Sequence, residues 1–150
     1  MTKEEKKLLL NVLKDGLPYG LKLQITDVDE FTFNGELRVL SKNWCRLNIT
    51  DPVKRAKVKN QTIPLNCIYI KPYLRPLSSM TEEEKRELNG LLPEVYDFTF
   101  RMDELLELIQ TQKEIPFHYI DWLNAHHFDY RGLIPMGLAL EAPEDMYKNF

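Results

Sequence analysis

Cysteine is scarce in this chain, which has only Cys45 and Cys67 among 150 residues. Two cysteines without CxxC spacing are too few for a disulfide scaffold, so both are expected to be thiols in a reducing compartment. Long apolar runs are also missing, since the longest are far shorter than the roughly 18 residues that suggest a membrane span. The opening residues, MTKEEKKLLL, contain no long apolar signal segment. We therefore expect a cytoplasmic protein that does not interact with a membrane.

Known catalytic motifs are absent as well. The chain contains no GxSxG, P-loop, CxxC pair, HExxH or glycine-rich dinucleotide fingerprint. Nucleophilic and phosphate-cradling chemistries therefore have no positive support, although a site assembled from distant residues would leave no such motif. We expect no cofactor and no dedicated metal site.

The composition is that of a folded globular protein. Hydrophobic residues make up 43% of the chain and aromatic residues 11%, which favours a packed core over a disordered chain. A length of 150 residues is close to the commonest size of a single domain. We therefore predict one compact unit over residues 1–150.

The first 76 residues have the pattern of a helix followed by a small sheet. Apolar residues at helical spacing predict a helix over residues 3–14. From Leu21 the apolar residues alternate with polar ones, and Asn34-Gly35 between two β-prone runs predicts a tight hairpin. Further strands are expected over residues 44–49 and 67–70, with the basic stretch VKRAKVKN between them.

The second half, residues 77–150, is predicted to be mainly helical. Pro72 and Pro76 favour an extended connector between the halves, and Thr81 with Glu84 forms the pattern of a capping box that starts a helix. The remaining expected elements are helices over 102–109 and 117–131 and an extended tail over 142–150. The predicted fold class is therefore α+β: an N-terminal helix, a small antiparallel β-sheet or open barrel, and a helical C-terminal half.

Charge is divided unevenly between the two parts of the chain. Residues 1–75 hold 14 Lys and Arg against 8 Asp and Glu, a net charge of +6, whereas residues 76–150 hold 6 against 15, a net charge of −9. This asymmetry favours two faces with different partners, or two halves that dock on each other.

Histidines and carboxylates crowd the segment DWLNAHHFDYRGLI, which invites a metal or acid/base interpretation of His126, His127 and Asp129. On a helix over residues 117–131, however, adjacent His126 and His127 diverge by about 100°. Both then fall on a broad aromatic face, which favours packing over catalysis. A continuous helix would still allow contacts between His126 and Asp129 and between His127 and Arg131.

A basic constellation accompanies an aromatic residue in the predicted sheet. Between Arg38 and Lys59 the only acidic residue is Asp51. On one face of a sheet, such residues could combine phosphate contacts with base stacking. The candidate nucleic-acid-binding residues are Trp44, Arg46, Lys54, Arg55 and Lys57.

Three stretches of the chain are distinctive: LPYG (residues 17–20), KPYLRPLSSMTEEEK (71–85) and DWLNAHHFDYRGLIPMGLALEAPEDMY (121–147). Together they resemble a family of small proteins encoded by gut Bacteroidales and by their phages or integrated elements. The resemblance implies a bacterial or phage setting and an accessory role in a mobile element. It carries over no catalytic residue.

These observations lead to three functional hypotheses. The first is a non-enzymatic accessory or adaptor protein that binds an unidentified protein partner. The second is a nucleic-acid-binding module that uses the basic β region. The third is a metal-dependent hydrolase built on His126, His127 and Asp129. The oligomeric state is left open.

Overall fold

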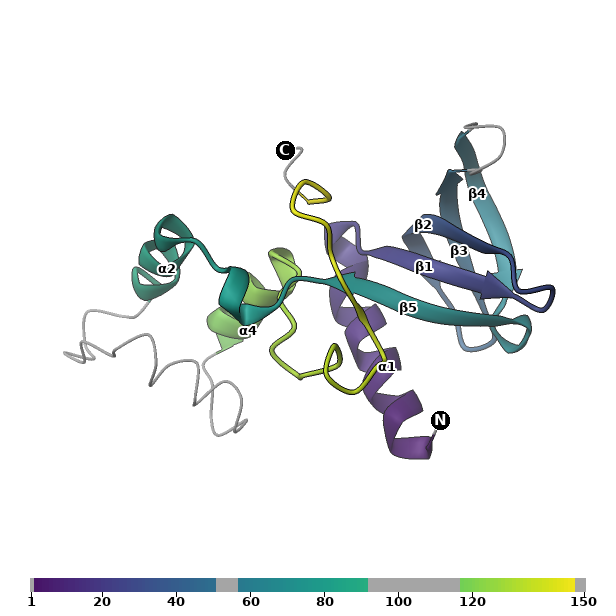
Figure 1. The fold of residues 1–150 in the computed structure, drawn as a ribbon, viewed down its shortest axis with the longest axis horizontal. Coiled ribbons are helices and arrows are strands. Elements are labelled where there is room, and N and C mark those ends of the chain that lie inside the picture. The colour runs from purple at the N-terminus through teal and green to yellow at the C-terminus, as the bar shows by residue number, and fades with distance from the viewer. Residues whose placement is uncertain (1, 51–56, 92–116, 148–150) are drawn as a thin grey trace.

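The computed structural model describes residues 2–50, 57–91 and 117–147 (Figure 1). The α+β class is confirmed: an N-terminal helix precedes a six-stranded, mostly antiparallel open sheet, and two later helices are described. In chain order the helices and strands are α1 (Lys3–Gly16), β1 (Lys22–Asp27), β2 (Thr32–Leu40), β3 (Trp44–Thr50), β4 (Lys57–Pro64), β5 (Ile68–Leu74), α2 (Glu82–Asn89), α4 (Phe117–Ala125) and β6 (Leu140–Glu141). The predicted helix over 102–109 lies outside the described residues.

The sheet has the order β4-β3-β2-β1-β5-β6. Strands β1 to β4 form an antiparallel meander, β5 returns to pair with β1, and the short β6 joins β5 in parallel. A single 3-10 turn, Leu65–Cys67, connects β4 to β5, although three strands separate them in the sheet order. Figure 1 shows this curved sheet at one end of the molecule and α2 and α4 at the other.

Helix α1 packs its apolar stripe against the sheet. The Thr2 side chain caps the helix by accepting a hydrogen bond from the Glu5 N–H at 3.1 Å. Leu9, Val12 and Leu13 are buried in one hydrophobic core with inward-facing residues of β1, β2, β3 and β5, and the partly buried Ile63 of β4 packs against it. We call this cluster the sheet core.

A second cluster, the helical core, lies around α2 and α4. Its buried members are Met80, Leu88, Tyr119, Trp122, Leu123, Phe128 and Tyr130. After α4 the chain returns to the first cluster, because Leu133, Leu138 and Ala139 are buried in the sheet core. Among the described residues, no helix has the length and apolar character that crossing a bilayer would require.

The predicted hairpin at Asn34-Gly35 is wrong, because both residues lie inside the continuous strand β2. A Cβ atom at Gly35 would lie 3.3 Å from the Asn48 carbonyl oxygen, so the glycine permits a close approach between strands. The hairpin turn lies instead at residues 28–31, where the Asp27 carboxylate accepts hydrogen bonds from two backbone N–H groups.

Three other expectations also need correction. Pro72 lies within β5 rather than in a connector, at a position where β6 does not yet pair with this strand. Much of the basic stretch VKRAKVKN belongs to β4, which the sequence did not predict. The expected extended tail contains a turn over residues 144–147 and is held to the sheet by Tyr147.

Candidate binding sites

The histidine-rich segment is not one continuous helix. Helix α4 ends at Ala125, and His127 has a left-handed backbone with φ of 60°. Residues 127–129 pair instead with Arg75, directly after β5. The Arg75 N–H donates to the His127 carbonyl at 2.7 Å, and the Asp129 N–H donates to the Arg75 carbonyl at 2.8 Å. The predicted helix over 117–131 is therefore wrong beyond residue 125, and its helical spacings of His126 to Asp129 and His127 to Arg131 do not exist.

His126 is part of the helical core's aromatic stack. Its ring lies 3.9 Å from the Trp122 ring, centroid to centroid, and is nearly parallel to it. Its Nδ1 lies 2.8 Å from the Trp122 carbonyl oxygen. Because a carbonyl oxygen only accepts, Nδ1 carries the proton, and Nε2 is the acceptor nitrogen of the neutral ring.

His127 is buried and stacks on the ring of Tyr147 at a centroid distance of 3.7 Å. Burial, together with the nearby charges of His126, Arg75 and Lys22, lowers the pKa of His127 to about 4, although a backbone hydrogen bond with Tyr19 acts in the opposite direction. The imidazole is therefore neutral at physiological pH. Its Nδ1 has no hydrogen-bond partner among the described residues.

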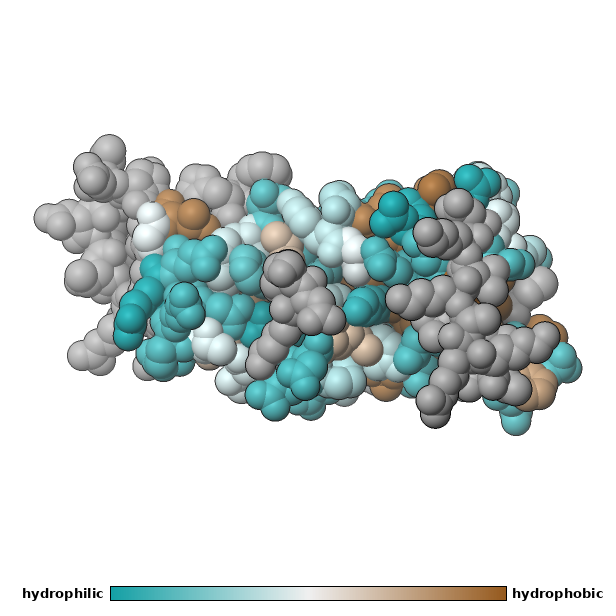
Figure 2. All heavy atoms as spheres, turned by 90° about the horizontal axis from the view of Figure 1, so that it is seen from above, coloured by the Kyte–Doolittle hydropathy of each residue, from teal (hydrophilic) through white to brown (hydrophobic). Residues whose placement is uncertain are grey.

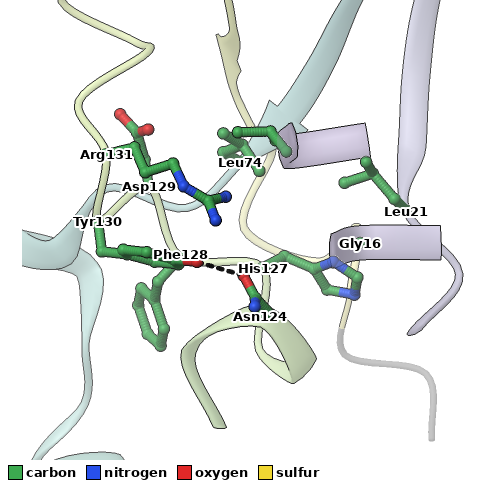
Figure 3. Close-up of a pocket in the computed structure, with 10 residues that line it drawn as sticks. Gly16, Leu21, Leu74, Asn124, His127, Phe128, Asp129, Tyr130 and Arg131 are labelled. Carbon is green, nitrogen blue, oxygen red and sulfur yellow. Dashed lines mark hydrogen bonds between the residues drawn. The ribbon is translucent and has the colours of Figure 1, made fainter. Parts of the chain in front are cut away.

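Asp129 has a structural task rather than a catalytic one. Its two carboxylate oxygens accept hydrogen bonds from the N–H groups of Leu133 at 2.8 Å and Ile134 at 2.9 Å. The side chains of Asp129 and His127 point away from each other in the close-up of this region (Figure 3). The carboxylate thus holds the turn that returns the chain to the sheet core.

The hydrolase arrangement is therefore not assembled from His126, His127 and Asp129. No group of three or more His, Cys, Asp or Glu side chains in residues 2–50, 57–91 and 117–147 is placed to hold a metal ion. The side chain of His118, the third histidine, is not described.

The two neighbouring histidines do line one cavity of about 500 Å³, at the junction of the end of β5, the start of α2 and the segment after β6. We call it the junction cavity. Its other walls come from the end of β5, the start of α2 and residues 141–147. Arg75 and Glu84 form a two-pronged ion pair there, with N–O distances of 2.6 and 2.7 Å, and the guanidinium carbon of Arg75 lies 4.2 Å from the centroid of Phe128.

Only two of the five candidate nucleic-acid-binding residues have described side chains. Trp44 and Arg46 share the outer face of β3, because the intervening Cys45 faces the sheet core. The guanidinium carbon of Arg46 lies 5.5 Å from the centroid of the Trp44 ring. Lys54 and Arg55 lie outside the described residues, and of Lys57 only the backbone is described, opposite Thr50.

A third site, which the sequence did not indicate, lies at the β1–β2 turn. Val28, Phe31 and Tyr69 have exposed fractions of 75%, 69% and 75%, and they are three of the five exposed large hydrophobic residues in the described part of the chain. Tyr69 opposes Thr26 on the neighbouring strand, next to the turn. We call these three residues the apolar tip. Hydrophobic and hydrophilic surface lie side by side at this end of the molecule (Figure 2).

The apolar tip was not predicted from the sequence, because Phe31 has the pattern of an ordinary strand residue. The useful signal was Asp27, four residues before Phe31, because an aspartate at the start of a turn bonds the backbone that follows it.

Comparison with models of known protein families, with curated proteins and with solved structures finds no match for this chain.

Proposed function

We propose that this protein is a non-enzymatic accessory or adaptor protein that binds a protein partner through the apolar tip. The observation that carries this proposal is the exposure of Val28 and Phe31 on one turn beside Tyr69. Val28 and Phe31 are three residues apart on the turn. Tyr69 pairs with Thr26, two residues before the turn, so three exposed apolar residues occur within a short stretch at this end of the sheet. Exposed apolar residues grouped in this way, rather than scattered singly, are typical of interaction sites. Aromatic side chains are also the commonest anchors of protein interfaces.

The turn that presents these side chains is held in one conformation. The Asp27 carboxylate accepts hydrogen bonds from the N–H groups of Asp29 at 2.9 Å and Phe31 at 3.0 Å. Two backbone hydrogen bonds of 3.0 Å close the same loop, and Glu30 has a left-handed φ of 63°. A turn organised in advance loses less conformational entropy on binding, which favours affinity.

The charge around the tip indicates the kind of partner. Asp29 and Glu30 are exposed between Val28 and Phe31, so two acidic residues lie between the two apolar ones of the turn. A complementary surface would have an apolar pocket with basic side chains at its rim. The same carboxylates disfavour an anionic lipid surface and a second copy of the tip. We place this interaction in a bacterial or phage setting, as the sequence resemblance implies.

Site-specific photocrosslinking in bacterial host cells tests the proposal. A photoreactive phenylalanine analogue would replace Phe31 in one variant and, as a matched control, Leu10 in another, because Leu10 is an exposed apolar residue on α1. We expect a discrete partner adduct from position 31 and none from position 10. Adding Asp29→Lys and Glu30→Lys should reduce that adduct about tenfold, because charge reversal at an interface costs at least about 1.4 kcal/mol.

Two results would overturn the proposal. One is the same adducts from both positions, and the other is adducts that contain only further copies of this chain.

Nucleic-acid binding is a second proposal, supported by the Arg46 guanidinium beside the Trp44 ring on the outer face of β3. Fluorescence anisotropy with single- and double-stranded oligonucleotides should then give an affinity that falls steeply with salt. Trp44→Ala should weaken binding to single strands, whereas Lys7→Ala on α1 should not. The absence of binding at low salt would remove this proposal.

A further inference from the structure

We propose that the junction cavity binds an ammonium or guanidinium group carried on a short apolar body. Its volume of about 500 Å³ falls within the range of ligand sites, roughly 300–1,000 Å³. Its walls come from three separate segments of the chain, residues 75–84, 126–127 and 141–147. This site is separate from the apolar tip and does not depend on the function proposed for it.

The charges of the cavity walls favour a cation. Three carboxylates, those of Glu84, Glu141 and Glu144, line the cavity together with one guanidinium, that of Arg75. Arg75 is already neutralised, because Glu84 binds it through both carboxylate oxygens and the Ser79 carbonyl accepts from it at 3.4 Å. An anion would therefore have to compete with a carboxylate that is fixed in place.

His127 strengthens this preference, because its buried ring adds no positive charge and its Nδ1 has no hydrogen-bond partner among the described residues. His127 is neutral at physiological pH, because its pKa is lowered to about 4. The Nδ1 of His126 is engaged with the Trp122 carbonyl, so Nε2 is the remaining polar atom of that ring. An ammonium or guanidinium group has only hydrogen-bond donors, and in its neutral state this nitrogen is an acceptor.

The remaining walls suit an apolar body. Pro76, Ala142 and Pro143 line the cavity together with the side chain of Tyr147. Apolar walls with a few placed polar groups are the usual composition of a ligand site. Two sources share this chemistry, a free diamine and a lysine side chain of a peptide.

Titration of the full-length protein, followed by NMR of its three histidine rings, tests the proposal. The probes are 1,5-diaminopentane, a capped pentapeptide with one central lysine, and pentane-1,5-diol as the uncharged control. We expect at least one cationic probe to shift imidazole signals with a Kd near or below about 1 mM, and the diol to have no effect. Tighter binding of 1,5-diaminopentane would identify a free diamine as the ligand, and tighter binding of the pentapeptide would identify a peptide lysine.

Matched variants separate a local site from general attraction to the acidic half of the chain. Glu141→Gln should weaken binding about threefold to fivefold, as expected for the loss of one partly exposed charge pair. Glu83→Gln, an equal charge change in the first turn of α2 and outside the cavity lining, should leave the Kd unchanged. Three results would overturn the proposal. They are equal weakening by both variants, equal binding of the diol, and no imidazole shift at a probe concentration 10-fold above the expected Kd. Phe31→Ser at the tip should have no effect on this Kd.

Discussion

Although histidine is a common residue of acid/base chemistry, the ring and backbone of His127 connect elements of the fold. The ring is buried against Tyr147, while the backbone carbonyl accepts a hydrogen bond from Arg75 at 2.7 Å. Its left-handed φ of 60° directs the chain away from α4 and along the end of β5. A histidine held in this way is suited to joining elements, and its neutral ring avoids a buried charge.

We predict that His127 makes the protein less stable as the pH falls from about 6.5 to 4. Its pKa is about 4 in the folded protein and 6.5 ordinarily, so within this window the unfolded chain binds a proton that the folded chain does not. The unfolded state is therefore favoured increasingly, and the loss in the free energy of unfolding reaches about 3 kcal/mol at the lower end. Urea unfolding at pH 7.5 and at pH 4.5 measures this loss.

The matched variant for that measurement is His127→Asn, because asparagine tolerates a positive φ. This variant should be less stable than the wild type at pH 7.5 and should lose most of the pH dependence. His126→Gln, which leaves the buried ring in place, should retain most of it. A wild-type pH dependence in His127→Asn would show that other groups cause the loss.

At the scale of elements, the sequence predicted best where local chemistry and tertiary packing agree. Helix α1 has an acidic first turn and a single apolar stripe, and α2 has a complete capping box of Thr81 and Glu84. Strand β3 alternates buried and more exposed residues as expected. In each case the local pattern and the final environment favour the same conformation.

The sequence failed where long-range contacts overrode local preference. Asn34-Gly35 is a strong turn signal, but pairing with both β1 and β3 keeps it inside β2. The helical pattern after Ala125 is overridden by two backbone hydrogen bonds with Arg75, which lies about 50 residues earlier in the chain. No local pattern contains that information.

The candidate sites also differ in whether local sequence patterns or long-range contacts determine them. Sequence reasoning found Trp44 and Arg46, whose shared face follows from strand alternation. It also found the two histidines that line the junction cavity, but it could not bring Glu141 and Arg75 to that cavity, because they come from distant parts of the chain. The apolar tip required knowing which apolar residues remain exposed, which depends on the complete fold.

At the scale of the whole molecule, two ion pairs join residues 1–75 to residues 76–150. The pair of Arg75 with Glu84 follows the uneven charge of the two parts, whereas the pair of Arg131 with Asp15 runs against it. Tyr19 also donates a hydrogen bond to Asp121. These contacts join the two parts within the described residues, and one unit over residues 1–150 stays a prediction.

Tyr147 is the side chain that most directly connects the sheet to the histidine-rich segment. Its hydroxyl donates to the Tyr73 carbonyl at 2.7 Å and accepts from the Lys22 N–H at 3.0 Å, while its ring stacks on His127. The Lys22 side chain adds a hydrogen bond of 2.8 Å to the Met146 carbonyl. The C-terminal segment therefore couples the two cores.

The two tryptophans allow this coupling to be measured, since Trp44 lies on the sheet and Trp122 lies in the helical core. We predict that, within each of the Trp122→Phe and Trp44→Phe variants, the fluorescence of the remaining tryptophan and the far-UV circular dichroism give the same urea midpoint, because one cooperative unit has one transition. Adding Tyr147→Ala should lower stability by about 3 kcal/mol and separate the two midpoints. Tyr147→Phe keeps the stacked ring, so it should cost only about 1 kcal/mol and leave the midpoints together.

Separate midpoints without any change at Tyr147 would mean that the two cores fold independently, and that the junction cavity lies between two domains rather than inside one.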